Sequence, residues 1–64
     1  MRIKLNGEFC ETQSQTVAEL LRELNTPEKG VALAQNGQVV RRSEAAKTPL
    51  RENDDIELIH AVQG

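Results

Sequence analysis

A single amphipathic helix limits what this chain can fold into more than any other feature of its sequence. The apolar residues of this helix recur at positions i, i+3, i+4 and i+7, on one helical face: Val17, Leu20, Leu21 and Leu24. The segment 16–19, Thr-Val-Ala-Glu, is typical of a capping box and predicts where the helix begins. The helix should end near Asn25, because Thr26 precedes a proline and is therefore disfavoured in the helical region.

Two predicted β-hairpins flank the helix along the chain. Residues 2–5 alternate polar and apolar side chains, as a half-buried strand does. Asn6-Gly7 favours a tight turn after them, because both turn positions need a positive φ. Asn36-Gly37 is a second such turn. The pattern therefore predicts paired strands at 2–5 and 8–11, and again at 31–35 and 38–41.

The last stretch of the chain, residues 54–64, is a further predicted strand. It begins at the turn signal Asn53-Asp54, alternates apolar residues and runs to a glycine. Before it, residues 43–46 predict one helical turn with Ser43 as its N-cap. The expected order of the main elements is therefore β-β-α-β-β-β.

These elements predict an α+β domain. Two hairpins and one main helix cannot build a layered α/β fold, so a mixed sheet of four to five strands packed on the helix is the economical solution. The first and last strands then lie side by side at its centre. We expect residues 1–64 to form one domain, with a short flexible C-terminal tail at 61–64. We expect Ile3, Leu5, Ile56 and Leu58 to face the helix, and Arg2, Lys4, Glu57 and Ile59 to face outward.

Composition argues against several classes of function. The chain has 64 residues, a formal net charge of -2 and one cysteine, so it forms no internal disulfide and no cysteine-ligated metal or iron–sulfur site. Mild acidity and a single aromatic residue, Phe9, argue against nucleic acid as a partner. No stretch is long and apolar enough to span a bilayer, and no secretory signal is visible. We therefore expect a cytoplasmic protein with no metal and no membrane contact.

Few side chains are candidates for chemistry. Cys10, alone in a strand, is more often a small packing residue, and a single histidine, His60, makes a poor metal site. Ile59 is more informative, because an outward apolar residue often centres a partner surface. The sequence contains no recognisable acid–base or nucleophile–base pair, so we expect no independent enzyme. Two charged groups are expected to face solvent: Arg41 and Arg42, and the acidic residues Glu52, Asp54, Asp55 and Glu57.

Four segments taken together resemble one known family. They are the turn at Asn6-Gly7, the T-V-x-E-L-L helix at 16–21, the V-A-L-A-x-N-G segment at 31–37 and the D-x-I-E-L-I-x-A-V-Q-G ending at 54–64. In this order they resemble the ThiS family, the sulfur carrier proteins of thiamine biosynthesis, over the whole chain. The resemblance implies a ubiquitin-like β-grasp fold.

The resemblance also implies a function for the C-terminus. In that family a ThiF-like enzyme uses ATP to adenylate the terminal carboxylate, and sulfur from a donor protein then replaces AMP to give a thiocarboxylate. A ThiG-like thiazole synthase receives the sulfur, while the carrier itself binds no cofactor. The family ends in Gly-Gly. This sequence ends in one glycine, so Gly64 aligns with the penultimate position and the family's final glycine is absent.

By the same resemblance, Gly64 is the carrier terminus and the residues before it contact the partners: Ile59, His60, Ala61, Val62 and Gln63. Two alternatives remain open. One is a MoaD-like sulfur carrier for molybdopterin synthesis, a related family whose members are typically longer. The other is a non-catalytic ubiquitin-like interaction module. Such a module would tolerate a blocked or extended C-terminus, whereas a carrier would not.

Overall fold

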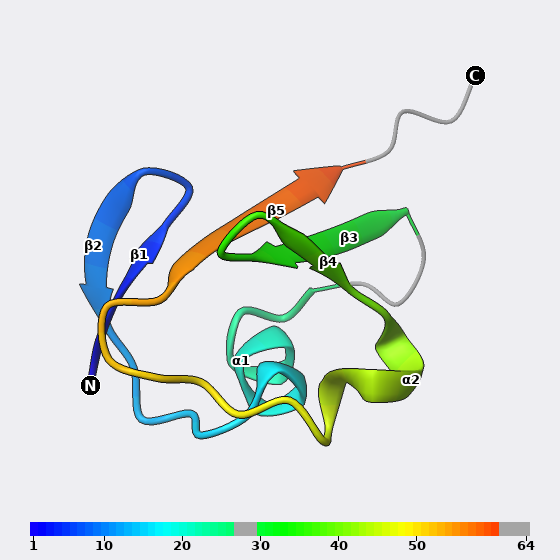
Figure 1. Cartoon of the computed structure of the whole chain (residues 1–64), viewed down its shortest axis with the longest axis horizontal. Coiled ribbons are helices and arrows are strands. Elements are labelled where there is room, and N and C mark those ends of the chain that lie inside the picture. The colour runs from blue at the N-terminus through cyan, green and yellow to red at the C-terminus, as the bar shows by residue number, and fades with distance from the viewer. Residues whose placement is uncertain (27–29, 61–64) are drawn as a thin grey trace.

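A computed structural model describes residues 1–26 and 30–60 of the chain (Figure 1). In chain order the elements are β1 (Arg2–Leu5), β2 (Glu8–Glu11), α1 (Val17–Glu23), β3 (Val31–Gln35), β4 (Gln38–Val40), α2 (Arg42–Ala45) and β5 (Asp55–His60). The strands of this described part form one mixed sheet in the order β2-β1-β5-β3-β4. β1 and β5 are parallel, and the other neighbours are antiparallel. In the same residues, no helix is long and apolar enough to cross a membrane.

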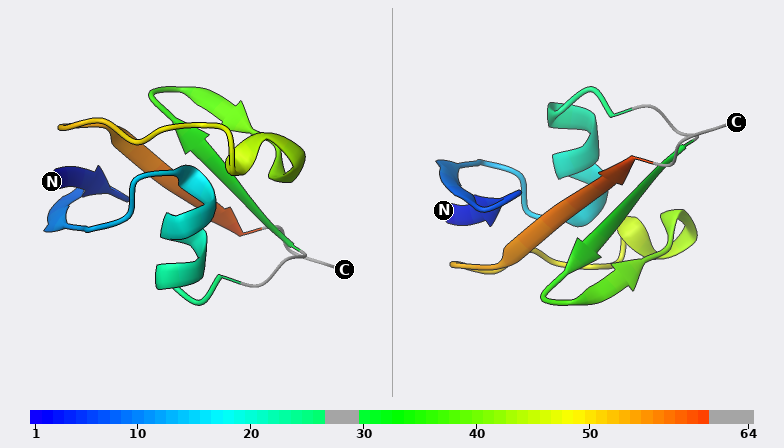
Figure 2. Two further views of the ribbon diagram at one scale, coloured as in Figure 1. Left: turned by 90° about the horizontal axis from the view of Figure 1, so that it is seen from below. Right: turned by 90° about the horizontal axis from the view of Figure 1, so that it is seen from above.

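The last strand lies at the centre of the sheet. β5 pairs with β1 on one side and with β3 on the other, so the predicted placement of the first and last strands is confirmed. The helix α1 covers one face of the sheet, and β5 and β3 are uncovered on the opposite face (Figure 2). The sheet and its main helix together give the predicted α+β architecture.

The core lies between the sheet and α1. Ile3, Val17 and Ile56 have no exposed surface, and burying an aliphatic side chain of this size contributes about 1.5–3 kcal/mol. Leu5 and Leu58, which the sequence also assigned to this face, are partly buried at the border of the core. The buried cluster as a whole comprises Ile3, Val17, Leu20, Leu21, Leu33, Ala45, Leu50 and Ile56.

The connection between α2 and β5 contributes a core residue that the sequence pattern did not indicate. Leu50 is only 5% exposed, and its N–H donates to the Gln15 carbonyl at 2.9 Å. Beside it, the N–H of Val17 donates to the Thr48 carbonyl at 2.9 Å. These two hydrogen bonds hold the connection against the start of α1, which places the Leu50 side chain in the core.

The predicted capping box forms at the start of α1, with one change. Thr16 Oγ1 accepts from the Glu19 N–H at 3.2 Å, as expected. The Glu19 carboxylate accepts from the Gln15 N–H at 2.7 Å, one residue earlier than the motif predicts. Two backbone N–H groups at the start of the helix, those of Gln15 and Glu19, therefore donate to these side chains.

The end of α1 is set by Asn25. This residue has a left-handed φ of 54°, its N–H donates to the Arg22 carbonyl at 3.1 Å, and the Thr26 N–H donates to the Leu21 carbonyl at 3.0 Å. That pair of bonds is a Schellman motif with asparagine in the position usually taken by glycine. The predicted end near Asn25 is confirmed, and the Schellman motif gives its local cause.

Two sequence-based expectations are wrong. Ser43 is not the N-cap of the short helix, because α2 begins at Arg42 and its cap position is Arg41, two residues before Ser43, with no side-chain cap bond. The Glu44 N–H donates to the Arg41 carbonyl instead. Asp54 does not face solvent: it is 6% exposed, because three hydrogen-bond donors surround its carboxylate.

A polar cluster ties the connection between β2 and α1 to the last turn of the helix. The hydroxyls of Thr12 and Ser14, both buried, donate to one carboxylate oxygen of Glu23 at 2.6 and 2.7 Å. The hydrogen bond from Thr12, followed by that from Ser14, lowers the pKa of Glu23 below its ordinary value, against a smaller opposing effect of burial. The segment that looked like a plain polar loop is therefore fixed in place.

Candidate functional site

Both Asn-Gly turns hold the strand that leads to the C-terminus. Asn6 donates its N–H to the Ile56 carbonyl at 2.9 Å, and its side-chain oxygen accepts from the Leu58 N–H at 2.9 Å. On the other side of β5, Asn36 donates its N–H to the Asp55 carbonyl at 2.8 Å and accepts from the Asp55 N–H at 2.9 Å. Both asparagines have a left-handed φ, near 50°, so the turns are of the predicted kind.

Asp54 locks the point where β5 enters the sheet. One carboxylate oxygen accepts from the Asn36 side-chain amide at 3.0 Å, and the other accepts from Gln35 and from the Arg51 N–H, both at 2.8 Å. Burial opposes ionisation of Asp54. The hydrogen bonds from Asn36, Arg51 and Gln35, with the charge of Arg51, outweigh it and hold the pKa of Asp54 below its ordinary value.

The outer face of the sheet, which α1 leaves uncovered, carries an apolar patch made of Ala32, Ala34, Val39 and Ile59, of which Ala34 is itself only 8% exposed. The strand register places these four together, because Ala32 pairs with Ile59 and Ala34 pairs with Val39. Ile59 is 48% exposed and Val39 is 65% exposed. The predicted outward orientation of Ile59 is thus confirmed, and Val39 is a further exposed residue that the sequence reasoning missed.

The other half of the outer face is basic and aromatic. Phe9 is 60% exposed on β2, with the guanidinium carbon of Arg2 4.6 Å and the Lys4 ammonium 5.7 Å from the ring centroid. These distances are typical of cation–π contacts. Cys10, the next residue, packs against the core from the opposite face of β2, as expected of a packing residue.

The comparisons with known proteins identify the family. The model of the ThiS family matches residues 2–64 of the chain. This chain belongs to the ThiS family. A Thermus thermophilus relative named "Sulfur carrier protein ThiS" is 35% identical over 60 residues, which cover 94% of this chain and 94% of the relative. An Escherichia coli relative of the same name is 35% identical over 65 residues, covering 100% of this chain and 98% of the relative.

Solved structures agree with this assignment to the ThiS family. The crystal structure of a thiamine biosynthesis protein (ThiS) from Geobacter metallireducens matches with a TM-score of 0.86 and 25% identity, over 100% of this chain and 99% of the other. An NMR structure of a thiamine biosynthesis protein from the same organism gives a TM-score of 0.81 at 25% identity, over 100% of this chain and 87% of the other. The resemblance to ThiS and the predicted β-grasp fold are both confirmed.

The partner-binding segment predicted from the ThiS resemblance is described only in part. Ile59 and His60 are the last two residues of β5, and both are exposed. The other predicted residues, Ala61, Val62, Gln63 and the terminal Gly64, lie outside the described residues. The roles assigned to all six therefore stay predictions.

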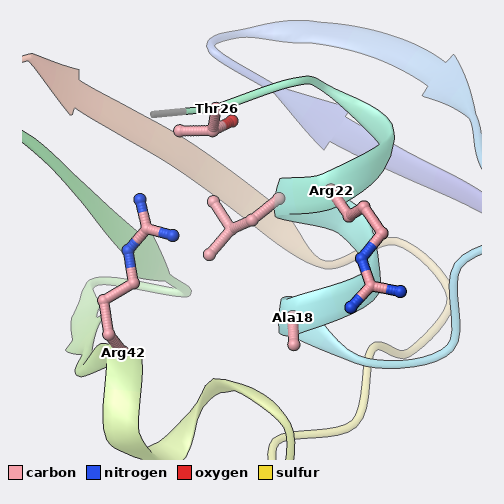
Figure 3. Close-up of a pocket in the computed structure, with 5 residues that line it drawn as sticks. Ala18, Arg22, Thr26 and Arg42 are labelled. Carbon is pink, nitrogen blue, oxygen red and sulfur yellow. The ribbon is translucent and has the colours of Figure 1, made fainter. Parts of the chain in front are cut away.

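A pocket of about 260 Å³ lies on the helical side of this ThiS-family domain (Figure 3). It is lined by Ala18, Leu21, Arg22, Thr26 and Arg42. The two arginines come from different helices, Arg22 from α1 and Arg42 from α2. Because α1 covers the inner face of the sheet, this pocket is on the opposite side of the sheet from the apolar patch (Figure 2).

Proposed function

We propose that this chain is a sulfur carrier in thiamine biosynthesis. Its C-terminal carboxylate is adenylated, converted to a thiocarboxylate and used as the sulfur source for thiazole formation. Membership of the ThiS family carries the proposal, because the matched relatives are named as sulfur carriers. The architecture supports it, because the central strand β5 passes an exposed apolar patch on its way to the C-terminal residues.

The chemistry needs little from the carrier itself. An α-carboxyl group has a pKa of roughly 3.5, so at neutral pH the terminus is an anion that can attack the α-phosphorus of ATP. Pyrophosphate leaves, and the resulting anhydride with AMP has an electrophilic carbonyl. Sulfide-level sulfur delivered by a donor protein then attacks this carbonyl, the new C–S bond forms as the bond to AMP breaks, and the thiocarboxylate remains on the carrier. A terminal glycine suits these steps, because it has no Cβ to block a narrow channel or the carbonyl.

Catalysis in this proposal belongs to the partners. A ThiF-like enzyme binds ATP and adenylates the terminus, and a ThiG-like thiazole synthase accepts the sulfur. The carrier supplies the reacting group and the surface by which both enzymes hold it. In this role the chain is a co-substrate and not an enzyme.

The apolar patch is the surface we assign to partner docking. It has two well-exposed side chains, Val39 and Ile59, and it lies beside the end of β5. A partner that covers it therefore holds the C-terminal residues close to its own active site. Asp55 and Glu57 lie on the same face of β5 as Ile59, and both are exposed. Their negative charges favour a partner whose docking surface has a basic rim.

Intact mass spectrometry tests the function directly. The purified chain is weighed before and after incubation with a ThiF-type adenylating enzyme, ATP and a sulfur donor. We expect a gain in mass equal to the replacement of one oxygen by sulfur, and none when ATP is left out. A chain with an amidated C-terminus is the matched control, because it keeps the domain and lacks the carboxylate.

The starting mass also determines which residue carries the carboxylate. If it corresponds to a chain ending at Gly64, the same assay is repeated on a chain extended by one glycine, which restores the Gly-Gly ending of the family. Thiocarboxylate on either chain supports the carrier function. Its absence from both, with an active adenylating enzyme, would leave the ubiquitin-like interaction module as the better account.

A further inference from the structure

The side of β5 that faces β1 is paired along only part of its length. β1 bonds to β5 through Lys4 and Leu5. The chain then turns away at Asn6, which donates its N–H to the Ile56 carbonyl and accepts from the Leu58 N–H through its side chain. Asn6 therefore ends the ladder on this side, and the last part of β5 extends beyond it.

Two backbone groups of β5, the Leu58 C=O and the His60 N–H, point to the β1 side of the strand beyond the place where Asn6 ends the ladder. In an antiparallel ladder, alternate residues direct their N–H and C=O groups to the same neighbour. Asp55 exchanges its bonds with Asn36 on the β3 side. Ile59 directs its N–H and C=O to the same side, toward β3. The N–H and C=O groups of Leu58 and His60 therefore point away from β3. Among the described residues, the Leu58 C=O and the His60 N–H have no hydrogen-bond partner.

We propose that this open edge, Leu58–His60, pairs with an extended segment of the adenylating partner that receives the C-terminal residues. The proposal rests on the carrier function and specifies how that partner grips β5. An N–H and a C=O two residues apart on one strand match the C=O and N–H of a single residue on a parallel neighbour. Strand addition of this kind is a general mode of peptide recognition.

The apolar patch explains why this edge would be paired on docking. Ile59 lies between the two open groups in sequence, and its side chain belongs to the patch. A partner that covers Ile59 removes water from the neighbouring Leu58 C=O and His60 N–H. Backbone groups that lose water without gaining a partner weaken an interface, so a good docking surface here must supply one donor and one acceptor.

Amide hydrogen exchange resolved by residue tests the pairing in the native chain. Exchange is measured for the isolated chain and for its complex with the ThiF-type adenylating enzyme. We expect the His60 amide to exchange about tenfold or more slowly in the complex. The Ile59 amide, already directed to β3, serves as the internal reference and should change less. A complex in which the His60 rate is unchanged would overturn the proposal.

A pair of variants isolates the His60 N–H. His60→Pro removes this donor and leaves the β3 ladder intact, because the N–H points away from β3 and proline suits a strand edge. His60→Ala removes the same side chain and keeps the N–H. We expect the proline variant to bind the adenylating enzyme about threefold to tenfold more weakly than the alanine variant. Equal affinities for two folded variants would count against the edge.

The outcomes separate this proposal from the carrier function. If the wild-type chain neither binds nor gains sulfur, the carrier function fails and the edge pairing fails with it. If the thiocarboxylate forms while the His60 amide stays unprotected in the complex, the edge pairing alone fails. If His60→Pro does not fold, as judged by thermal unfolding, the exchange measurement on the native chain decides.

Discussion

The two ends of β5 are held very differently. From Asp55 to Leu58, hydrogen bonds reach β5 from both sides, from Asn6 and Asn36. Just before the strand, the buried carboxylate of Asp54 accepts three more. Where it ends, at Ile59 and His60, the described residues pair with it only on the β3 side. The fold therefore fixes the entry of the central strand and leaves its exit accessible. A carrier needs both, because its terminus must be positioned and also reached.

The largest expected effect separates two isoleucines of the same strand. Ile56 has no exposed surface, so Ile56→Ala should lower the free energy of unfolding by about 2–5 kcal/mol, a large share of what so small a domain has. Ile59 is half exposed, and Ile59→Ala should cost about 0.5 kcal/mol or less. Urea denaturation of both variants measures the difference. Similar losses would mean that the two ends of β5 are equally integrated in the core.

Neighbouring aspartates give the next contrast. Asp54→Ala leaves the donors from Gln35, Asn36 and Arg51 without their acceptor, so we expect a loss of about 2 kcal/mol in the free energy of unfolding. Asp55 has an exposed side chain, and Asp55→Ala should stay within about 0.5 kcal/mol of the wild type. Denaturation curves of the pair provide the measurement. If both variants match the wild type, the Asp54 network does not anchor β5.

The same contrast shows what the sequence pattern can and cannot reveal. The helix, the hairpins and the central place of β5 were predictable, because apolar periodicity and Asn-Gly turns act locally and every element must pack on one helix face. The burial of Asp54 was not predictable. It depends on Gln35 and Asn36, which are 19 and 18 residues away along the chain. A run of acidic residues gives no sign of which one is enclosed.

The candidate site divides in the same way. Alternation along β5 predicted that Ile59 faces outward, because side chains on a strand alternate between its two faces. Val39 completes the apolar patch through its pairing with Ala34, which a single strand pattern cannot reveal. The open edge at His60 depends on where β1 stops and on the side chain of Asn6. Such features come from register between strands, which is set only in the folded sheet.

A charge at the accessible end tests docking. Ile59→Glu should leave the domain folded, because the side chain is half exposed, and should weaken binding to the adenylating enzyme about tenfold or more. Gln38→Glu adds the same charge at an exposed position of β4 outside the apolar patch and is the control. Isothermal titration calorimetry compares the two. Unchanged affinity for Ile59→Glu would remove the patch from the interface.

Asn6 marks the boundary between the held and the open part of β5. Asn6→Gly keeps the left-handed turn and removes only the side-chain acceptor for the Leu58 N–H, so we expect a loss of about 1 kcal/mol or less in the free energy of unfolding. Hydrogen exchange at the Leu58 amide should accelerate, while the Ile59 amide keeps its rate. Unchanged exchange at Leu58 would show that the Asn6 side chain does not close the ladder.

The smallest expected effect is a pH dependence of the free energy of unfolding, caused by Asp54 at the start of β5. The ordinary pKa of Asp54 is 3.8, and in the folded chain it is lower, because the hydrogen bonds and the charge of Arg51 outweigh burial. Unfolding therefore takes up a proton between the two pKa values, so the stabilisation is present above the ordinary pKa of 3.8 and is lost as the pH falls through the folded value. The pKa of Glu23 is lowered as well, so its contribution must be separated from that of Asp54. Denaturation from neutral to acidic pH compares three variants: Asp54→Asn, Glu23→Gln and the double variant. We expect Asp54→Asn to flatten the acid side of the profile. If the stability of Asp54→Asn falls with pH as steeply as that of the wild type, the charge on Asp54 does not stabilise the start of β5.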